Sequence, residues 1–299
     1  MNDMTVPKLN TTTPQDVLKD LTAELQELTP EVRKAAAYVL ENPNDVGVSS
    51  IREIAEAANV KPNTFVRMAR IVGFDGYDDF REPFREEIRK GGVPFPDRAR
   101  WLQSLAKGGK LDALYADSAA SAIANIEQTF AATDAKQIKA AADAIVNARH
   151  TYVMGVGINH ALARSFAYLA DMAVDNIQAI PREGNLAIDD IAHAGPDDVL
   201  LAMTFKPYRT EVVDTVEMAQ SQGVTIIGIS DSPAATIVTD SEYGFVVQTD
   251  TPQFFTSIVA AGALLETLMA FVIADASPAV IASIERFHER RHALGIYRE

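Results

Sequence analysis

The chain has 299 residues, of which 47% are hydrophobic, and it carries a net charge of −14 at pH 7 with no cysteine. This length and composition predict a globular protein of about two domains and exclude a largely disordered chain. The lack of cysteine excludes disulfides, thiolate metal sites and a thiol nucleophile, and with no other metal motif present we expect neither a metal nor a cofactor.

The N-terminal region is predicted to be helical. Residues 1–13 are polar and lack the apolar core of a signal peptide, which favours a cytoplasmic protein. After a Thr-rich lead-in over Leu9–Asp16, helices are predicted at Val17–Leu28 and Pro30–Glu41. Thr29 and Pro30 suit the cap and first position of the second helix, and Asn42-Pro43-Asn44 is predicted to end it.

Two short helical patterns follow, joined by a tight break. In the first, apolar side chains recur at helical spacing: Ile51, Ile54, Ala55 and Ala58. Asn59 is the non-glycine residue that best tolerates a left-handed helix end, and Pro62 suits the first turn of the next helix. In that second helix Phe65, Met68, Ala69 and Val72 point inward, whereas Asn63, Thr64, Arg67 and Arg70 share the opposite face.

A helix that offers these side chains suits the major groove of DNA. Arginine can donate two hydrogen bonds to guanine, asparagine can pair with adenine, and threonine or the helix N-terminus can hold a phosphate. An ordinary surface hairpin with solvated arginines is the alternative, but the short break and the absence of acidic residues over 61–72 favour the helix-turn-helix. The candidate DNA-binding residues are Ser50, Lys61, Asn63, Thr64, Arg67 and Arg70.

A domain boundary is predicted near residue 100. A charged amphipathic helix over Asp78–Lys90 is followed by Gly91–Pro96, the best linker candidate, and by a second break at Lys107–Lys110. We therefore expect a helix-turn-helix domain over residues 14–92, a linker over 93–110 and a second domain over 111–299.

The second half alternates strands with helices. Two Ala-rich helices, Leu111–Thr129 and Asp134–Asn147, precede five predicted strands: Thr151–Gly155, Ile177–Ile180, Val199–Met203, Thr225–Ile229 and Gly244–Gln248. Helices are predicted between them near Ala161–Val174 and Thr210–Gln222, and a last one over Phe254–Ala274. This pattern predicts a five-stranded parallel sheet flanked by helices, with a ligand crevice at the carboxyl ends of the strands.

The acidity of the chain lies in this half. Residues 1–110 hold 16 Lys/Arg and 17 Asp/Glu, whereas residues 111–299 hold 11 and 24. Such a distribution suits one module that faces DNA and another that stays clear of it. The most apolar run, Ile258–Ala274, contains Glu266 and is short for a membrane span, so no membrane contact is expected.

Two loops at predicted strand ends are candidate anion sites. Gly155–His160 opens a helix, where glycines allow close approach and free N–H groups attract anions, although His160 replaces the third glycine of a dinucleotide-binding motif. Lys206 and Arg209 follow the third strand and can hold an anion; the alternative is a polar loop capped by Thr210. The candidate effector-binding residues are Gly155, Gly157, Asn159, His160, Thr204, Lys206, Arg209 and Thr210.

Proton-transfer chemistry has candidates but no diagnostic arrangement. His160, His193, Glu183 and Glu211 are able to move protons in a sugar isomerisation. Each has an ordinary structural alternative, such as a surface histidine or a first-turn glutamate, and no pair has a recognisable spacing. We therefore expect no catalytic residues.

Both halves match one known arrangement. Leu28–Gly92 resembles the N-terminal domain of the RpiR (MurR/RpiR) family of bacterial transcriptional regulators, on residues that include Ile51–Ala58, Val60–Thr64, Arg67, Ala69-Arg70, Gly73-Phe74, Gly76-Tyr77 and Phe80-Arg81. Ile138–Ala274 resembles the sugar isomerase (SIS) domain that this family places next. The resemblance implies a homo-oligomer, a dimer or tetramer, that binds a palindromic operator in double-stranded DNA and responds to a small effector, commonly a phosphorylated sugar.

The chain departs from the family at the effector site. SIS domains that hold sugar phosphates usually carry a serine where this chain has Asn159, and a Ser-x-Ser-Gly turn where it has Thr204–Pro207. Two hydroxyls are lost and a lysine is gained, so a carboxylated sugar becomes as plausible as a phosphate ester. We expect a transcriptional regulator controlled by a small anionic sugar derivative; the alternative is a sugar-phosphate isomerase-like enzyme with an attached helical domain.

Overall fold

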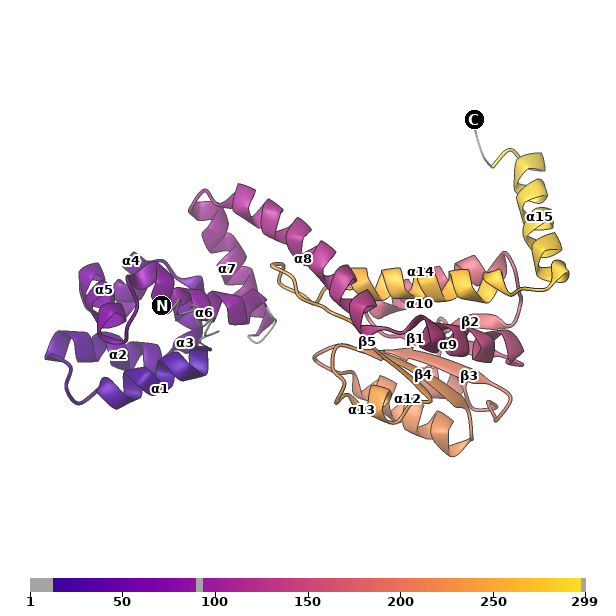
Figure 1. Ribbon diagram of the computed structural model, residues 1–299, viewed down its shortest axis with the longest axis horizontal. Helices are drawn as coiled ribbons and strands as arrows, with labels where there is room; N and C mark the ends of the chain where they lie inside the picture. Colours follow the sequence, from indigo (N-terminus) through magenta and orange to yellow (C-terminus); the bar gives the residue numbers. More distant parts are fainter. Residues whose placement is uncertain (1–12, 90–93, 297–299) are drawn as a thin grey trace, which may run out of the picture. The chain divides into compact units, whose positions relative to one another are not determined.

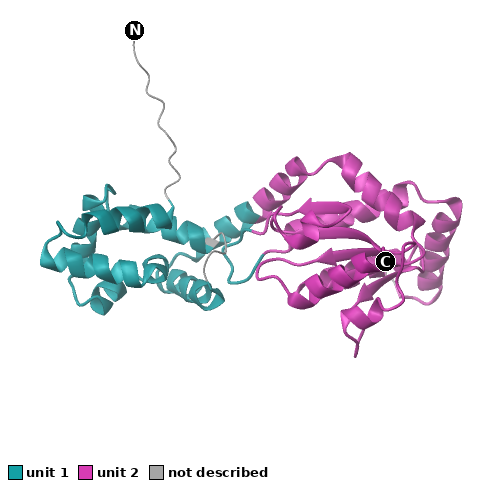
Figure 2. Cartoon of the chain, turned by 90° about the horizontal axis from the view of Figure 1, so that it is seen from below, with its two compact units in different colours: residues 1–121, 250–256 teal, residues 122–249, 257–299 magenta. Residues whose placement is uncertain are grey.

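The computed structural model describes residues 13–89 and 94–296. The chain divides into two compact units (Figure 2), one formed by residues 1–121 with 250–256 and the other by residues 122–249 with 257–299. Each unit has a hydrophobic core of its own.

The first unit is mainly helical over its described residues up to 121 (Figure 1). Its helices are α1 (Pro14–Glu24), α2 (Pro30–Glu41), α3 (Pro43–Val48), α4 (Ile51–Ala57), α5 (Pro62–Ile71), α6 (Tyr77–Arg89) and α7 (Phe95–Lys107). Proline stands in the first turn of α1, α2, α3, α5 and α7, where its missing N–H is not needed. Thr13 and Ser50 begin α1 and α4 with reciprocal capping boxes.

The predicted inward faces of α4 and α5 are confirmed. Ile54 and Ala55 of α4, and Phe65, Met68 and Ala69 of α5, are buried in one cluster with side chains of α1, α2 and α6. Burial of this apolar surface is what holds two helices of only 7 and 10 residues in place, since helices this short are marginal by themselves.

The second unit contains a parallel sheet, which confirms the predicted fold class. Helix α8 (Leu111–Ala132) runs from the first unit into the second, and α9 (Ala135–Asn147) leads to the sheet. The strands are β1 (Thr151–Gly155), β2 (Ile177–Ile180), β3 (Val199–Met203), β4 (Thr225–Ser230) and β5 (Tyr243–Val246), in the spatial order β2-β1-β3-β4-β5 with every neighbouring pair parallel. The other helices are α10 (Asn159–Asp171), α11 (Ala187–Asp190), α12 (Thr210–Ser221), α13 (Thr236–Thr239), α14 (Val259–Ala274) and α15 (Pro278–Ala293).

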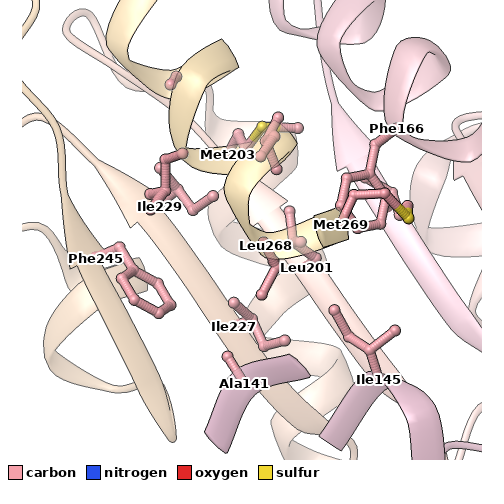
Figure 3. Close-up of a cluster of buried hydrophobic side chains, with 14 of the residues drawn as sticks. Ala141, Ile145, Phe166, Leu201, Met203, Ile227, Ile229, Phe245, Leu268 and Met269 are labelled. Carbon is pink, nitrogen blue, oxygen red and sulfur yellow. The ribbon is translucent and has the colours of Figure 1, made fainter. Parts of the chain in front are cut away.

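Helices cover both faces of the sheet. Along each strand successive side chains point to opposite faces. Leu201 and Ile227 therefore join a core with α9, α10 and α14 (Figure 3), whereas Leu200 and Ile226 join a second core with α11, α12 and α13. Strands β1 and β3 themselves are buried by this arrangement, and the first exposed residues after β3 are those of its following loop, from Lys206 on.

Several predicted boundaries were wrong. The helix over Pro30–Glu41 ends where predicted, but an additional helix, α3, begins at Pro43, because only Asn42 leaves the helical conformation between the two. Helix α14 begins at Val259 rather than Phe254, and β5 ends at Val246 rather than Gln248. Residues 250–256 are non-helical and belong to the first unit.

The predicted linker over 93–110 contains α7, whose buried Trp101 packs with Val48 and Ile88. Residue 90 of the predicted helix, residues 91–93 of the Gly91–Pro96 segment and the lead-in up to residue 12 lie outside the described residues. Across 13–89 and 94–296, no single helix has the length and hydropathy to cross a membrane. Helices α14 and α15 reach that length and hydropathy only when taken together, and they are bent by 116° at the break between them.

Candidate functional site

The turn between α4 and α5 has the predicted conformation. Asn59 adopts φ 53°, in the left-handed region, and the amide of Val60 donates to the carbonyl oxygen of Ala55 at 2.9 Å. The chain therefore turns sharply after α4, and Pro62 begins α5 with Lys61 and Asn63 exposed beside it.

Helix α5 presents two arginines to solvent. Arg67 and Arg70 are both exposed. The Nε of Arg70 donates to the carbonyl oxygen of Asp75 at 3.2 Å, which holds this guanidinium on the turn after α5. Arg67 makes no hydrogen bond or ion pair with another residue of the described chain. Its guanidinium is therefore the more available of the two.

The prediction that Thr64 lies on this exposed face was wrong. Thr64 is only 2% exposed. It stands one turn before Met68 and beside Phe65, both of which are buried. Helical spacing places Thr64 near the boundary between the exposed and buried faces of α5, and the packing of the unit buries it.

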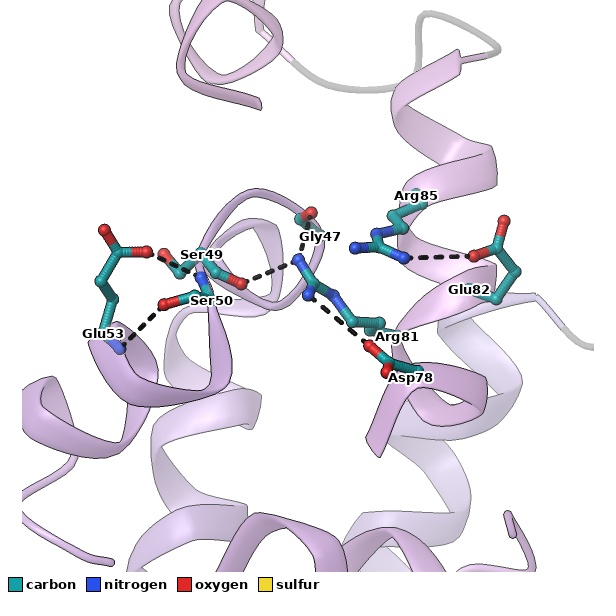
Figure 4. Close-up of polar contacts among 8 residues, drawn as sticks. All are labelled: Gly47, Ser49, Ser50, Glu53, Asp78, Arg81, Glu82 and Arg85. Atoms are coloured by element: carbon teal, nitrogen blue, oxygen red, sulfur yellow. Dashed lines mark hydrogen bonds and ion pairs between the residues drawn. The ribbon is translucent and has the colours of Figure 1, made fainter. Parts of the chain in front are cut away.

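Ser50 is exposed, but its polar atoms hold the start of α4 (Figure 4). The Ser50 Oγ accepts from the amide of Glu53 at 3.3 Å, and the Glu53 carboxylate accepts from the amide of Ser50 at 2.8 Å. The hydrogen bond from the Ser50 amide to the carboxylate is the main cause that lowers the pKa of Glu53. The predicted contact residue is thus also the cap of the helix that supports α5.

Arg81 of α6 supports this cap, and sequence reasoning gave it no such role. Its side chain is buried, and Nη2 donates to the carbonyl oxygens of Gly47 at 3.2 Å and Ser49 at 2.8 Å (Figure 4). Burial lowers the pKa of Arg81, and the charge of Arg85 lowers it further. The one signal in the sequence was that Arg81 stands three residues after Asp78. This spacing is common among ion pairs on helix surfaces, so it does not indicate a buried arginine.

At the sheet, the predicted anion loops lie next to each other. The ends of β1 and β3 are in register, with Gly155 opposite Met203, so the loops that follow both strands meet at one edge. A methyl group added at Gly155 would stand 2.2 Å from the carbonyl oxygen of Asn159. Glycine at 155 is therefore what lets α10 begin directly over the end of β1.

Arg209 connects the two loops. A methyl group added at Gly157, which has φ 64°, would stand 3.2 Å from the Nη2 of Arg209. The amide of Arg209 donates to the Oγ1 of Thr204 at 3.1 Å, and Thr204 is buried. The exposed guanidinium is thereby brought over the first loop, at the end of the sheet.

The first turn of α10 contributes two polar side chains. Asn159 is 6% exposed, and its Oδ1 is buried without a hydrogen-bond partner among the described residues. The Nδ1 of His160 lies 3.2 Å from the carbonyl oxygen of Gly155. An unpaired buried acceptor is costly, so Asn159 is suited to receive a hydrogen bond from a ligand or a water molecule.

A third loop, after β4, lies beside these two loops. The Asp231 carboxylate accepts from the amide of Lys206 at 3.2 Å. Burial raises the pKa of Tyr208, and the nearby Asp231 raises it further. Lys206 and Thr210 are exposed, and Thr210 is the first residue of α12. The loops after β1, β3 and β4 therefore place cations, amides and hydroxyls at the carboxyl ends of these three strands.

The candidate proton-transfer residues are dispersed. Glu183 and His193 are exposed and follow β2, whereas Glu211 lies in the first turn of α12. Among the described residues, no hydrogen bond joins any two of the four candidates, His160 included. Within residues 13–89 and 94–296, no group of three or more His, Asp or Glu side chains is placed to hold a metal ion.

Two family models match the chain. Residues 15–91 match the helix-turn-helix domain of the rpiR family, and residues 144–273 match the SIS domain. The HTH-type transcriptional regulator HexR of Pseudomonas aeruginosa is 24% identical over 219 residues, which are 72% of this chain and 73% of HexR.

Solved structures show the same fold. The Vibrio vulnificus NanR protein complexed with ManNAc-6P matches with a TM-score of 0.54 at 19% identity, covering 93% of this chain and 99% of that one. The sugar isomerase domain of an RpiR transcription factor from Sphaerobacter thermophilus matches with a TM-score of 0.55 at 21% identity, covering 59% of this chain and 98% of that domain.

Proposed function

The chain belongs to the rpiR family of helix-turn-helix transcriptional regulators, and we propose that its α5 reads an operator whose occupancy an anionic sugar derivative controls. The observation that carries the DNA half is the exposed face of α5. Lys61, Asn63 and Arg67 are exposed there, and no acidic residue occurs over 61–72. An Arg or Asn side chain at the start of a helix can reach base edges in the major groove, and Lys61 can neutralise a phosphate.

Ser50 supports a second contact with the DNA backbone. The N-terminus of a helix attracts phosphate, and in a helix-turn-helix the first helix crosses the backbone. The exposed Ser50 caps α4, and Arg81 holds the residue before it through the carbonyl oxygen of Ser49. We assign Arg81 a positioning role here, since its own guanidinium is buried.

The ligand half of the proposal rests on Arg209. Its guanidinium lies beside Gly157. Asn159, whose buried Oδ1 has no hydrogen-bond partner among the described residues, stands at the end of the same loop as the first residue of α10. A guanidinium can hold a carboxylate or phosphate through two parallel hydrogen bonds. Together with Thr204 and Lys206, this favours a phosphorylated or carboxylated sugar. The ManNAc-6P bound by NanR, which has the same fold, supports the phosphorylated class.

Control of DNA binding follows from differential affinity. A ligand shifts the protein toward the arrangement that it binds more tightly, and so changes operator affinity by the same coupling free energy. We propose that the protein acts as a homodimer or tetramer, because two copies of α5 would then read the two halves of a palindrome.

Selection of bound genomic fragments by the full-length protein tests the DNA half. Retention of a fragment with a palindromic motif, with an affinity that falls steeply as salt is raised, is the expected result. A thermal-shift panel of phosphorylated and carboxylated sugars tests the ligand half, with stabilisation expected for one of them. Turnover of a phosphosugar by a protein that retains no DNA would instead establish the isomerase-like alternative.

A further inference from the structure

The loop between β5 and α14 belongs to the unit that contains the DNA-binding helices. Residues 250–256 cluster with residues 1–121, whereas β5 before them and α14 after them are in the other unit. The chain therefore passes between the two units at residues 121/122, 249/250 and 256/257. The crossing at 249/250 follows the carboxyl end of β5, and the crossing at 256/257 lies just before α14.

Helix α7 holds this loop through two side chains. The Nη2 of Arg98, which is 2% exposed, donates to the carbonyl oxygen of Thr251 at 2.8 Å. The ring of Phe95 contacts that of Phe255, with centroids 4.7 Å apart. A buried guanidinium is expensive to leave unpaired, so the bond to Thr251 resists opening.

Hydrogen bonds connect the other end of the loop to the proposed ligand site. Ser230 Oγ donates to the carbonyl oxygen of Thr204 at 2.7 Å, and the amide of Val247 donates to the carbonyl oxygen of Ser230 at 2.9 Å. Thr204 in turn receives the amide of Arg209. A displacement of the loop after β3 therefore acts on the end of β4 and, through it, on Val247. Val247 follows β5 and lies two residues before Thr249, where the chain crosses between the units.

The loop itself is built to transmit such a displacement. Residues 250–256 contain no glycine, and Pro252 fixes one backbone dihedral angle. At its base the amide of Ser257 donates to the carbonyl oxygen of Thr249 at 3.2 Å, which closes the loop on itself. A closed loop with few backbone conformations moves as a body more readily than it deforms.

We propose that residues 250–256 form a coupling strap, with Arg98 as its positioning residue, which links the strand ends of the SIS domain to α7 of the DNA-binding unit. The strap gives the proposed ligand control a physical route, and in that respect it rests on the proposed function. In this arrangement the ligand site acts on the residues just before the strap, and α7 holds Thr251 and Phe255 within it.

Hydrogen–deuterium exchange in the full-length, DNA-free protein tests the strap without any ligand. Arg98→Gln removes the charge that holds Thr251 and should raise exchange at the amides of Val247 and Ser257 by about tenfold or more, the loss expected for one bond from a charged donor. Phe255→Ala, which leaves no unpaired charge, should act in the same direction. The matched controls are Arg100→Gln, whose side chain is 66% exposed, and Phe254→Ala, which is 49% exposed.

An increase confined to α7 and residues 250–256, or one equal in the control variants, would overturn the proposal. A second arm adds the selected operator fragment. Because coupling is reciprocal, DNA should change exchange at Val247 in the wild-type protein and leave it unchanged in Arg98→Gln. An unchanged Val247 amide in DNA-bound wild type contradicts the strap alone, whereas failure to bind any fragment contradicts the proposed function.

Discussion

The Arg209 guanidinium lies so close to Gly157 that a methyl group at position 157 would stand 3.2 Å from its Nη2. Gly157 also has φ 64°, a conformation that costs other residues roughly 1–2 kcal/mol. We expect Gly157→Ala to lower the free energy of unfolding by about that amount in urea denaturation. Because the methyl group also displaces Arg209, the variant should lose the thermal shift produced by an anionic sugar.

Gly184→Ala separates these two effects. Gly184 has φ 84°, and a methyl group there meets nothing within 4 Å. This variant should lose comparable stability and keep its response to the sugar. If both variants responded to the ligand like wild type, Arg209 would not be the anchor of the anion.

Arg67→Ala should weaken operator binding by about 1–3 kcal/mol if the guanidinium reads a base. The dissociation constant is measured by gel shift at a fixed salt concentration, because phosphate contacts depend strongly on salt. Lys34→Ala is the control, since Lys34 is an exposed cation of α2 whose ion pair with Glu31 is 2.9 Å long. Equal dissociation constants for the two variants would remove Arg67 from the interface. Thr64→Val should leave affinity unchanged, because Thr64 is buried.

Arg81→Met should destabilise the DNA-binding unit. It leaves the carbonyl oxygens of Gly47 and Ser49 without their donor, and a bond from a charged donor contributes about 1.5–3 kcal/mol. A loss of about 3 kcal/mol is expected by urea denaturation. Arg85→Met is the comparison. Arg85 forms an ion pair of 3.6 Å with Glu82, whose side chain is about half exposed, so this variant should lose less than about 1 kcal/mol of its free energy of unfolding. Similar losses for both would show that the two carbonyl bonds contribute little.

Asp198 should make stability depend on acid pH. Its carboxylate accepts from the Nε of Arg149 at 2.9 Å and from the amides of Gly195 at 2.8 Å and His150 at 3.1 Å. Burial alone would raise the pKa of Asp198, but these donors and the charge of Arg149 lower it on balance. A carboxyl whose pKa is lower in the folded state stabilises the protein above its ordinary pKa, and that contribution is lost as the pH falls through the folded value.

Asp198→Asn is therefore expected to cost about 1.5–3 kcal/mol at pH 7. Its difference from wild type should begin to shrink as the pH falls below about 4, where the carboxyl of the unfolded wild-type chain takes up a proton, and should vanish only below the lower pKa of the folded state. Urea denaturation of both proteins between pH 7 and pH 3 measures this difference. Asp197→Asn, at the exposed neighbouring position, serves as the control. A cost that stays constant over this range would show that the charge of Asp198 is not what stabilises the fold.

Local sequence was sufficient for much of this architecture. The strand positions followed from short apolar runs, and the α4–α5 turn from Asn59 and Pro62, because each of these signals acts within a few residues. The start of α14 could not be read in the same way. Residues 254–258 are apolar enough to continue the helix, and the contact between Phe255 and Phe95, 160 positions earlier in the sequence, holds part of this stretch outside it.

The candidate site was predictable in part for the same reason. Parallel strands bring their carboxyl ends together, so the loops at Gly155 and Thr204 were expected to meet, although the contact of Arg209 with Gly157 required side-chain positions. Thr64 was assigned to the wrong face because periodicity alone does not fix how wide the buried stripe of a helix is. Arg81 was missed because its partners are backbone carbonyls more than thirty residues away.

The turn at Gly155 accepts no side chain, since a single methyl group would overlap the carbonyl of Asn159. By contrast, every side chain from Lys206 to Thr210 is exposed. Sequence change during divergence, or in a randomised library, thus has room in the loop after β3 and almost none at position 155. Preference for a new metabolite is most easily acquired by exchanging residues after β3 while the glycine turn stays fixed.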